Sequence, residues 1–343
     1  MGGHSHRQAP LPSIVMLAVA LTASACAAPH TPSPSAASQH PAPSTAVARS
    51  VGPAPSSELS ARDALRSATS ARLASSTVPV PSFGHIYLIV MENHEYSSIV
   101  GSSHAPYLNS LIRRYGLATN YHAVTHPSLP NYLAMFAGST FGIRDDGIHN
   151  LTAHNLADQL AAHGRTWHVY AQDLPSRCYT GASARGGVDL VGAAGWYARK
   201  HEPAISFTDI SHNATRCARI THLAGFSPTA ASFELIVPNM TNDMHDGTVA
   251  QGDAFLRAFV PRITGSTAFA RSLLVITWDE GSTSLGGGGH VATIVISPAV
   301  RSGFRSSIAH THYSLLRTIE DAWGLGCLNR TCTANDLREF FAR

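Results

Sequence analysis

Five short runs of the chain are apolar at almost every position instead of at alternate ones. Runs of this kind suit strands that are buried on both faces of a mainly parallel sheet. Patterns with a helical period lie between them. This alternation predicts an α/β fold, an αβα sandwich around a mainly parallel sheet. The expected strands are 85–91, 166–171, 233–237, 272–278 and 292–297, and the expected helices are 106–116, 155–164, 247–260 and 313–324.

The stretch THPSLPNYLAMFAG, residues 125–138, places Ser128 between two prolines and directly before an apolar run. Proline is tolerated in the first turn of a helix, where its missing N–H would have no partner. The run to Ala137 therefore predicts a short buried helix that ends at Gly138. Ser128 would stand at the N-terminus of this helix, where free N–H groups and the helix dipole favour an anion. A simple capping serine is the alternative.

The N-terminal part of the chain does not look foldable. Residues 1–26 combine a basic start, an apolar run and a small-residue cleavage zone, which indicates a signal peptide and export. Cys26 resembles a bacterial lipobox cysteine, although Ala23 replaces the usual leucine. We expect lipidation of Cys26 and attachment to a membrane, with plain cleavage nearby as the alternative. Residues 27–80 are rich in Ala, Ser and Pro and predict a flexible linker. The folded domain is expected at 81–343.

The cysteines agree with export, and the charge of the chain bears on its partners. Four cysteines remain besides Cys26, and the economical pairs are Cys178–Cys217 and Cys327–Cys332, although three connectivities are possible. The net charge is only +3. Arginines do not cluster with aromatic residues, so the sequence gives no support to a nucleic-acid partner.

Polar residues follow three of the predicted strands. Glu92 and Asn93 follow the first, Asp279 and Glu280 follow the fourth, and the third leads into a segment that contains Asn242, Asp243, His245 and Asp246. Ligands of α/β sheets collect beyond the carboxyl ends of the strands. Residues of this kind also form ordinary turns. Three such ends together nevertheless favour a functional site.

Glu92, Asp279 and Glu280 would bring three negative charges together, which is costly without a cation. Oxygen ligands suit Mg²⁺, Ca²⁺ or Mn²⁺, and nearby histidines would admit Zn²⁺ or Fe. A divalent ion would lower the pKa of the Ser128 hydroxyl and polarise a phosphoryl oxygen. The serine would then attack a phosphate ester in line and form a phosphoseryl intermediate that water cleaves.

Six stretches of the chain resemble a known family. They are IVMENHEYSSIVG, HPSLPNYLAMFAGST, PNMTNDMHDGTVAQGDAFL, VITWDEG, GGGGHVATIVISP and HYSLLRTIEDAWGL. Together they resemble the bacterial phosphoesterase family that includes acid phosphatases and phospholipases C, over residues 85–325 and in the family's order. The resemblance implies the alkaline-phosphatase-like sandwich and a hydrolase that acts on phosphate esters.

The resemblance also implies roles for individual residues. It makes Glu92, Asn93, Asp279 and Glu280 metal ligands, and Ser128 both a ligand and the nucleophile. The SLPNY segment is similar to the TFPNH pattern of nucleotide pyrophosphatases.

Four further residues receive weaker assignments from the same resemblance. Asn131 is expected to contact phosphate. His245 is expected to bind phosphate or to protonate the leaving group, and His290 and His312 are lesser phosphate-binding candidates.

Three alternatives stay open at this point. A serine hydrolase triad of Ser128, His245 and Asp243 is one, although Ser128 lacks the G-x-S-x-G elbow. A phospholipase C-type phosphodiesterase is another, but no lipid-docking domain follows the motif region. This shifts the expectation toward a phosphatase acting on small phosphate esters. The last alternative is a surface lipoprotein that binds a phosphorylated ligand without turnover.

Overall fold

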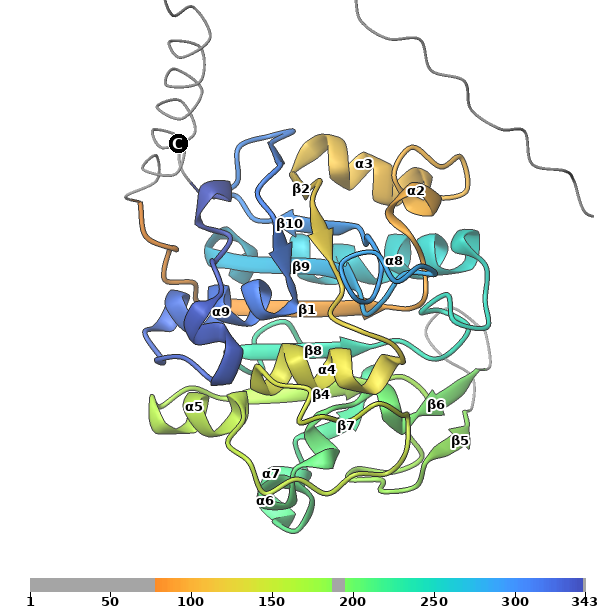
Figure 1. Cartoon of the computed structure of the whole chain (residues 1–343), viewed down its shortest axis with the longest axis vertical. Helices are drawn as coiled ribbons and strands as arrows, with labels where there is room; N and C mark the ends of the chain where they lie inside the picture. Colours follow the sequence, from red (N-terminus) through yellow and green to blue (C-terminus); the bar gives the residue numbers. More distant parts are fainter. Residues whose placement is uncertain (1–77, 187–194, 342–343) are drawn as a thin grey trace, which may run out of the picture. The chain divides into compact units, whose positions relative to one another are not determined.

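The computed structural model describes residues 78–186 and 195–341 (Figure 1). The predicted signal segment, Cys26 and all but the last three residues of the predicted linker lie outside the described residues. In the part of the chain that the structure describes, no helix combines the length and the apolar character that crossing a membrane requires.

The centre of the fold is an eight-stranded sheet with the order β11-β2-β10-β9-β1-β8-β4-β7. Its most buried strands are the runs that the sequence predicts, and they lie near the middle of the sheet. Short strands that the apolar pattern did not indicate complete the two edges. The strands of this sheet are β1 (His85–Met91), β2 (Gly116–Ala118), β4 (Trp167–Ala171), β7 (Ile220–His222), β8 (Phe233–Val237), β9 (Ser272–Trp278), β10 (Thr293–Ile296) and β11 (Arg305–Ser306).

The sheet is parallel except for β10, which runs antiparallel to both of its neighbours. The connection between β9 and β10 contains a glycine-rich stretch and no helix. A parallel return normally needs a crossover helix, so this direct connection brings the chain back in the opposite direction. The predicted αβα sandwich with a mainly parallel sheet is thus confirmed, with this one strand reversed.

Helices cover both faces of the sheet (Figure 1). Helices α4 and α9 pack against each other, and α3 packs against α8. All five predicted helices are present with small shifts at their ends. The α-helices are α2 (Tyr96–Ile99), α3 (Pro106–Arg114), α4 (Ser128–Ala137), α5 (Leu156–Ala162), α6 (Thr208–Ser211), α7 (Ala214–Cys217), α8 (Val249–Thr264) and α9 (His312–Trp323).

Smaller elements fill the connections. Two pairs of short strands lie outside the main sheet, namely β3 (Tyr121–His122) with β12 (His310–Thr311) and β5 (Ser183–Arg185) with β6 (Trp196–Ala198). The 3₁₀ turns are Arg199–His201, Ala204–Ser206, Leu223–Gly225, Thr267–Arg271, Asn329–Thr333 and Arg338–Phe340.

Helix α4 has the boundaries that the prolines and glycine predict. It begins at Ser128 and carries Pro130 in its first turn, and it ends where Gly138 adopts φ 67°. A Cβ at Gly138 would lie 2.2 Å from the carbonyl oxygen of Leu328. Glycine is therefore required here both for the left-handed conformation and for the close approach of the C-terminal segment.

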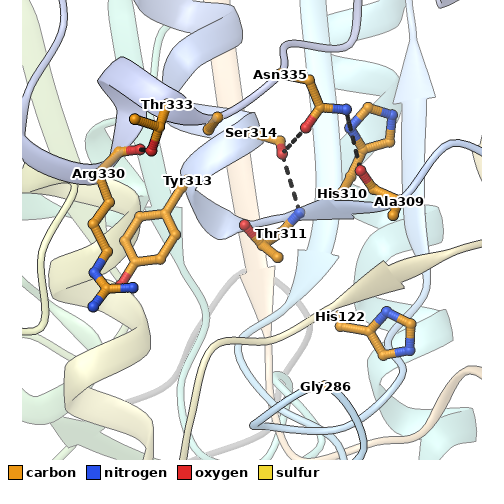
Figure 2. A pocket seen from close by; sticks show the side chains of 11 residues that line it. His122, Gly286, Ala309, His310, Thr311, Tyr313, Ser314, Arg330, Thr333 and Asn335 are labelled. Atoms are coloured by element: carbon orange, nitrogen blue, oxygen red, sulfur yellow. Dashed lines mark hydrogen bonds between the residues drawn. The ribbon is translucent and has the colours of Figure 1, made fainter. Parts of the chain in front are cut away.

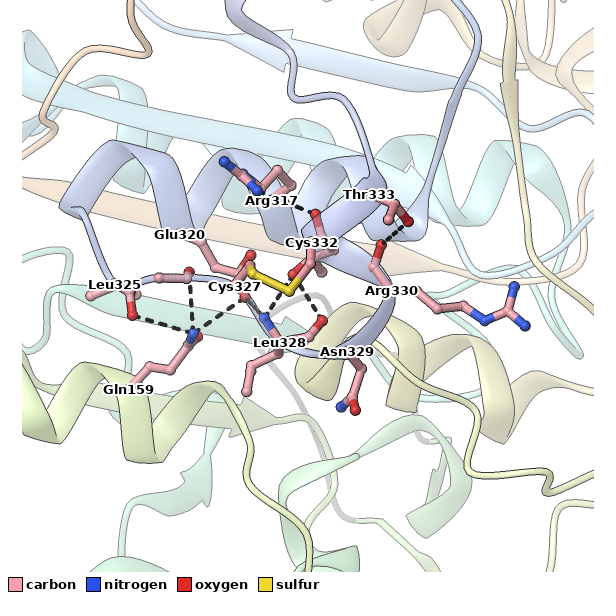
Figure 3. The surroundings of a disulfide bond; sticks show 12 residues. Gln159, Arg317, Glu320, Leu325, Cys327, Leu328, Asn329, Arg330, Cys332 and Thr333 are labelled. Carbon is pink, nitrogen blue, oxygen red and sulfur yellow. Dashed lines mark hydrogen bonds between the residues drawn. A yellow bond between two sulfur atoms is a disulfide. The ribbon is translucent and has the colours of Figure 1, made fainter.

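The structure contains the disulfides Cys178–Cys217 and Cys327–Cys332, the pairing that the sequence favours. Figure 3 shows the second bond beside the end of α9. The Leu328 N–H donates to Glu320 Oε1 over 2.8 Å, and the Gln159 amide donates to Glu320 and to the carbonyls of Leu325 and Gly326. These contacts join the C-terminal loop to α5 and α9.

Glu234 is a buried acid near the amino end of β8, away from the carboxyl ends of the strands. Its Oε1 accepts the Ala231 N–H over 3.1 Å, whereas its Oε2 has no hydrogen-bond donor among the described residues. Burial raises the pKa of Glu234 from 4.5 to about 8. Between these values the folded protein holds a proton that the unfolded chain releases. The stabilisation is fully present below pH 4.5 and is lost as the pH rises through about 8.

We therefore expect Glu234→Gln to have a pH-dependent effect on stability. The variant removes the titration and keeps the size of the side chain, so it should gain stability relative to the parent as the pH rises from 4.5 to 8. Denaturant unfolding of both proteins across this range measures the difference. All other titrating groups are shared, so a difference that stays constant with pH would contradict the assignment.

Candidate active site

The register of the central strands brings two of the predicted acids together. Met91 of β1 pairs with Trp278 of β9, so Glu92 and Asp279 follow at the same level of the sheet. The Asn93 N–H donates to Asp279 Oδ1 over 3.2 Å, and the Glu92 N–H donates to the Asp243 carbonyl over 2.8 Å. The carboxyl ends of β1 and β9 and the segment after β8 thus form one site, as expected for a parallel sheet.

Ser128 points at this site from the start of α4. Its Oγ donates to Glu92 Oε2 over 3.2 Å. One helical turn later, the Tyr132 hydroxyl donates to Glu92 Oε1. Residues four apart lie on the same helix face, so α4 presents both hydroxyls to a single carboxylate. Ser128 is 1% exposed, so its hydroxyl is held in a buried and fixed position.

Two histidines complete the surroundings of Glu92. His201 is buried, with Nε2 3.2 Å from Glu92 Oε2 and Nδ1 3.2 Å from Asp243 Oδ2. Glu92, His201 and His245 each offer one ligand atom, and these atoms all lie within 4.8 Å of one another. Asp243 lies next to the Nδ1 side of the His201 ring, where a carboxylate commonly stands when the other ring nitrogen binds a metal ion.

The rim of the site includes the partly exposed side chains of His126, Lys200 and His245. Glu280 Oε2 lies 3.0 Å from His126 Nδ1 and accepts from the Asn131 amide over 3.2 Å. Lys200 Nζ lies 3.2 Å from His245 Nε2, and it donates to Asp146 Oδ2 over 3.0 Å. The buried acids are therefore flanked by partly exposed histidine and lysine side chains.

Several buried atoms of the site lack a hydrogen bond. They are Asn93 Oδ1, His201 Nε2, Asp243 Oδ2 and Asp279 Oδ2. Buried polar atoms are normally satisfied. The pairs at 3.2 Å that involve His201 are close but are not aligned as hydrogen bonds. Oxygen and nitrogen atoms that converge without bonding to one another fit a divalent cation.

The electrostatics of the site lead to the same conclusion. Burial raises the pKa of Glu92 to about 8 and that of Asp243 to about 7. Burial and the charges of Glu92 and Glu280 hold the pKa of Asp279 well above its usual range. Burial lowers the pKa of His201 despite its contact with Asp243. The protein alone does not compensate these negative charges, so the residues present fit a bound metal ion.

Comparison with known proteins identifies the family. Residues 102–326, which include α4 and the site segments of β8 and β9, match the Phosphoesterase family. This match covers more than half of the chain. The chain belongs to the Phosphoesterase family. The resemblance that the sequence motifs indicate is therefore confirmed.

The similar proteins with curated names are phosphatases. The chain is 34% identical over 249 residues to a phosphatidylinositol-3-phosphatase of Mycobacterium tuberculosis, covering 72% of this chain and 79% of that protein. It is 29% identical over 274 residues to an acid phosphatase of Aspergillus fumigatus, covering 76% of this chain and 60% of that one. The phosphoesterase is accordingly a hydrolase that acts on phosphoric ester bonds.

The fold also occurs in solved structures that are distant in sequence. A lipoteichoic acid synthase from Listeria monocytogenes superimposes with a TM-score of 0.51 at 10% identity, covering 76% of this chain and 78% of that chain. At this identity the likeness concerns the fold alone.

Most of the residues that the sequence singles out lie together in the phosphoesterase. The structure joins Glu92, Asn93, Ser128, Asn131, His245, Asp279 and Glu280 through the contacts above. Asn131 uses its Oδ1 to accept the N–H groups of Val124 and Thr125, so its present contacts hold the segment before Ser128 as well as Glu280.

Two predicted histidines lie outside this set of contacts. His290 stacks on Tyr96 at 4.4 Å, and its Nε2 lies 3.1 Å from the Thr119 carbonyl. His312 is buried next to the residue that follows β9, where Nε2 lies 2.5 Å from the Asp279 carbonyl and Nδ1 lies 3.2 Å from the Tyr121 hydroxyl. With both ring nitrogens of His312 engaged, these contacts fit a support for the end of β9 better than a phosphate contact.

The alternative serine hydrolase triad is not assembled in the described residues. His245 Nδ1 lies 2.7 Å from Asp246 Oδ1, and Nε2 faces Lys200, whereas Ser128 donates to Glu92. Because a triad requires the serine to bond the histidine, this arrangement does not support it.

Sequence reasoning missed four groups of the site: Tyr132, Asp146, Lys200 and His201. Tyr132 carries a usable signal, because it stands four residues after Ser128 on the same helix. The other three lie on loops or a 3₁₀ turn and follow none of the predicted strands. Only the tertiary fold brings them to the site.

A separate cavity of about 350 Å³ lies at the start of α9 (Figure 2). Its lining includes His122, Gly286, Tyr313 and Arg330. Asn335 accepts the Ser314 hydroxyl at Oδ1 over 3.1 Å and donates to the Ala309 carbonyl over 3.1 Å. Asn335, Ser314 and Ala309 in its wall are thus hydrogen-bonded to one another.

Proposed function

We propose that this phosphoesterase is an exported, metal-dependent phosphatase that hydrolyses phosphate monoesters through a phosphoseryl intermediate at Ser128. One observation carries the proposal. The Ser128 hydroxyl, fixed at the first residue of α4, donates to Glu92 within a buried set of carboxylates and histidines that have unpartnered atoms. A nucleophile held rigidly at such a centre suits phosphoryl transfer, in which positioning and electrostatics supply most of the catalysis.

The metal ion is proposed to bind between two groups of residues. Glu92, Asn93, Ser128, Asp279 and Glu280 are the ligands that the sequence predicts. His201 extends the donor set on the other side of Glu92. A bound divalent ion would supply positive charge that favours the ionised serine and polarises a phosphoryl oxygen. The mixture of nitrogen and oxygen donors admits Zn²⁺, Fe and Mn²⁺ as well as Mg²⁺ and Ca²⁺.

Individual residues of the chain then carry out separate steps of the reaction. Ser128 Oγ attacks phosphorus, so that a bond to the serine forms while the bond to the leaving oxygen breaks. Its proton passes toward Glu92, which already accepts a hydrogen bond from the Ser128 hydroxyl. His245, oriented by Asp246, protonates the departing alkoxide. Water then cleaves the phosphoserine and releases inorganic phosphate and the free hydroxyl.

Monoesters are the preferred substrate class because the similar curated proteins are named as phosphatases. Export is supported by the two disulfides, which persist in oxidising compartments. Attachment through a lipid at Cys26 remains a prediction from the sequence.

A panel of three esters tests the proposed function. The dialysed full-length protein is assayed on p-nitrophenyl phosphate, bis-p-nitrophenyl phosphate and p-nitrophenylphosphorylcholine, with each divalent metal added back. We expect metal-restored release that is fastest on the monoester. Preference for either diester would favour the phospholipase C-type activity. Binding of metal without turnover of any ester would favour a phosphate-binding lipoprotein.

A further inference from the structure

Lys200 is the only lysine of the chain, and it stands at the rim of the proposed catalytic site. Its Nζ lies 3.0 Å from Asp146 Oδ2 and 3.2 Å from His245 Nε2. Its charge also interacts with Glu92 and Asp279. Of the arginines and lysines among the described residues, Lys200 is the one whose ion pairs and hydrogen bonds reach the residues of this site. A fixed positive charge is therefore built into an otherwise acidic site.

Asp146 ties this lysine to the helix that carries Ser128. Its Oδ1 accepts the Leu129 N–H over 3.0 Å, while its Oδ2 accepts from Lys200. A single carboxylate thus bridges the first turn of α4 and the ammonium group. These two hydrogen bonds of Asp146 fix the position of the Lys200 ammonium group relative to the first turn of α4, where the Ser128 hydroxyl lies.

Lys200 is more exposed to solvent than the proposed nucleophile and its hydrogen-bond acceptor. The side chains of Lys200 and His245 are 19% and 23% exposed, whereas Ser128 is 1% exposed and Glu92 is fully buried. An ammonium group has three N–H donors, and the described contacts use two of them. A third donor remains for an acceptor that enters from solvent.

We propose that Lys200 is a catalytic residue that binds a non-bridging phosphoryl oxygen of the substrate and of the product phosphate. A phosphate dianion that approaches Glu92, Asp279 and Glu280 meets like charges, and an ammonium at the rim offsets this repulsion. Asp146 is a positioning residue that acts through Lys200. This inference rests on the proposed function, because it assigns the group that recognises phosphate at the same site.

The single lysine makes a direct binding test possible. Acetic anhydride acetylates free amines, and peptide mass spectrometry follows acetylation of Lys200 in the full-length protein with and without inorganic phosphate. We expect phosphate, at concentrations that inhibit turnover, to slow this acetylation at least tenfold, because an occupied ammonium is shielded. The matched control is Arg113→Lys, which adds an exposed lysine at the end of α3 whose acetylation should not respond to phosphate. Equal rates at Lys200 with and without inhibitory phosphate would overturn the proposal.

Kinetics of Lys200→Met provide the second arm. A charge-assisted hydrogen bond contributes about 1.5–3 kcal/mol, so the inhibition constant of phosphate should rise roughly tenfold to a hundredfold. Lys200→Arg, which keeps the charge, should recover part of this loss, and Arg113→Met should change nothing. Unaltered phosphate inhibition in a folded Lys200→Met variant that still turns over would refute the lysine assignment and leave the proposed function intact. Phosphate protection of Lys200 in a parent protein that hydrolyses no ester would instead refute the proposed function and support the lysine site.

Discussion

Ser128→Ala is expected to lower turnover of a phosphate monoester by about 10⁴-fold or more while the protein remains folded. Removal of a nucleophile leaves only the binding and electrostatic contributions of the site. The structural cost is small in comparison, because the lost hydroxyl makes one hydrogen bond to Glu92, and such a bond contributes about 1 kcal/mol. Initial rates and thermal unfolding of the same preparation measure both quantities.

Ser139→Ala is the matched control for this variant. Ser139 follows the other end of α4, where its Oγ accepts the Phe141 N–H over 3.0 Å. Its loss should leave turnover within a factor of about two, since surface substitutions away from special features have small effects. A Ser128→Ala variant with near-normal turnover would remove the phosphoseryl mechanism, whatever the effect on stability.

Asp279→Asn should lose metal and turnover together, and it should change stability in opposite directions with and without metal. The asparagine keeps an Oδ1 acceptor for the Asn93 N–H but removes one of the buried charges. We expect metal content below one tenth of the parent's and turnover lower by about a thousandfold. In the presence of a chelator, the variant should unfold at a higher temperature than the parent, because folding of the parent without metal must protonate this buried carboxylate and the neutral asparagine avoids that cost. With metal present, the parent should be the more stable protein.

Glu95→Gln is the control for this second experiment. Glu95 follows β1, three residues after Glu92, but its Oε1 accepts from the Thr283 N–H and hydroxyl and does not join the cluster. Its variant should retain metal and turnover. If Asp279→Asn binds as much metal as the parent, or is destabilised equally in both conditions, Asp279 is not a ligand.

The strand ends show how far the sequence alone leads to this site. Glu92 and Asp279 were predictable because continuous apolar runs define the central strands, and parallel strands place their carboxyl ends at one edge. Ser128 was predictable because prolines and a glycine mark both ends of its helix. These signals are local, and each depends only on neighbouring residues.

The positions of His201 and Lys200 in the site could not be predicted from local sequence patterns. Both lie on the 3₁₀ turn Arg199–His201, which follows β6 at the periphery and not a central strand. Their approach to Glu92 depends on the packing of this turn against α4. Ring stacking of His201 on Tyr132 at 5.4 Å is part of that contact. No periodicity in the sequence encodes a contact between such distant segments.

His312 illustrates the opposite case, in which a motif suggests a role that the contacts do not favour. It stands at the first residue of α9, close to Asp279 in space, so its association with the site is real. The orientation of its ring depends on Tyr121 and on the Asp279 carbonyl, which the motif does not specify. The position of His312 near the site was thus easier to predict from the sequence than its chemical role.

The stereochemistry of the reaction at phosphorus tests the central claim most directly. A phosphorothioate monoester made chiral with oxygen isotopes is hydrolysed in isotopically labelled water, and the configuration of the released thiophosphate is determined. Attack by Ser128 followed by attack by water consists of two in-line displacements, so the account predicts overall retention. Overall inversion would show that water attacks the ester directly, and it would contradict a phosphoseryl intermediate at Ser128.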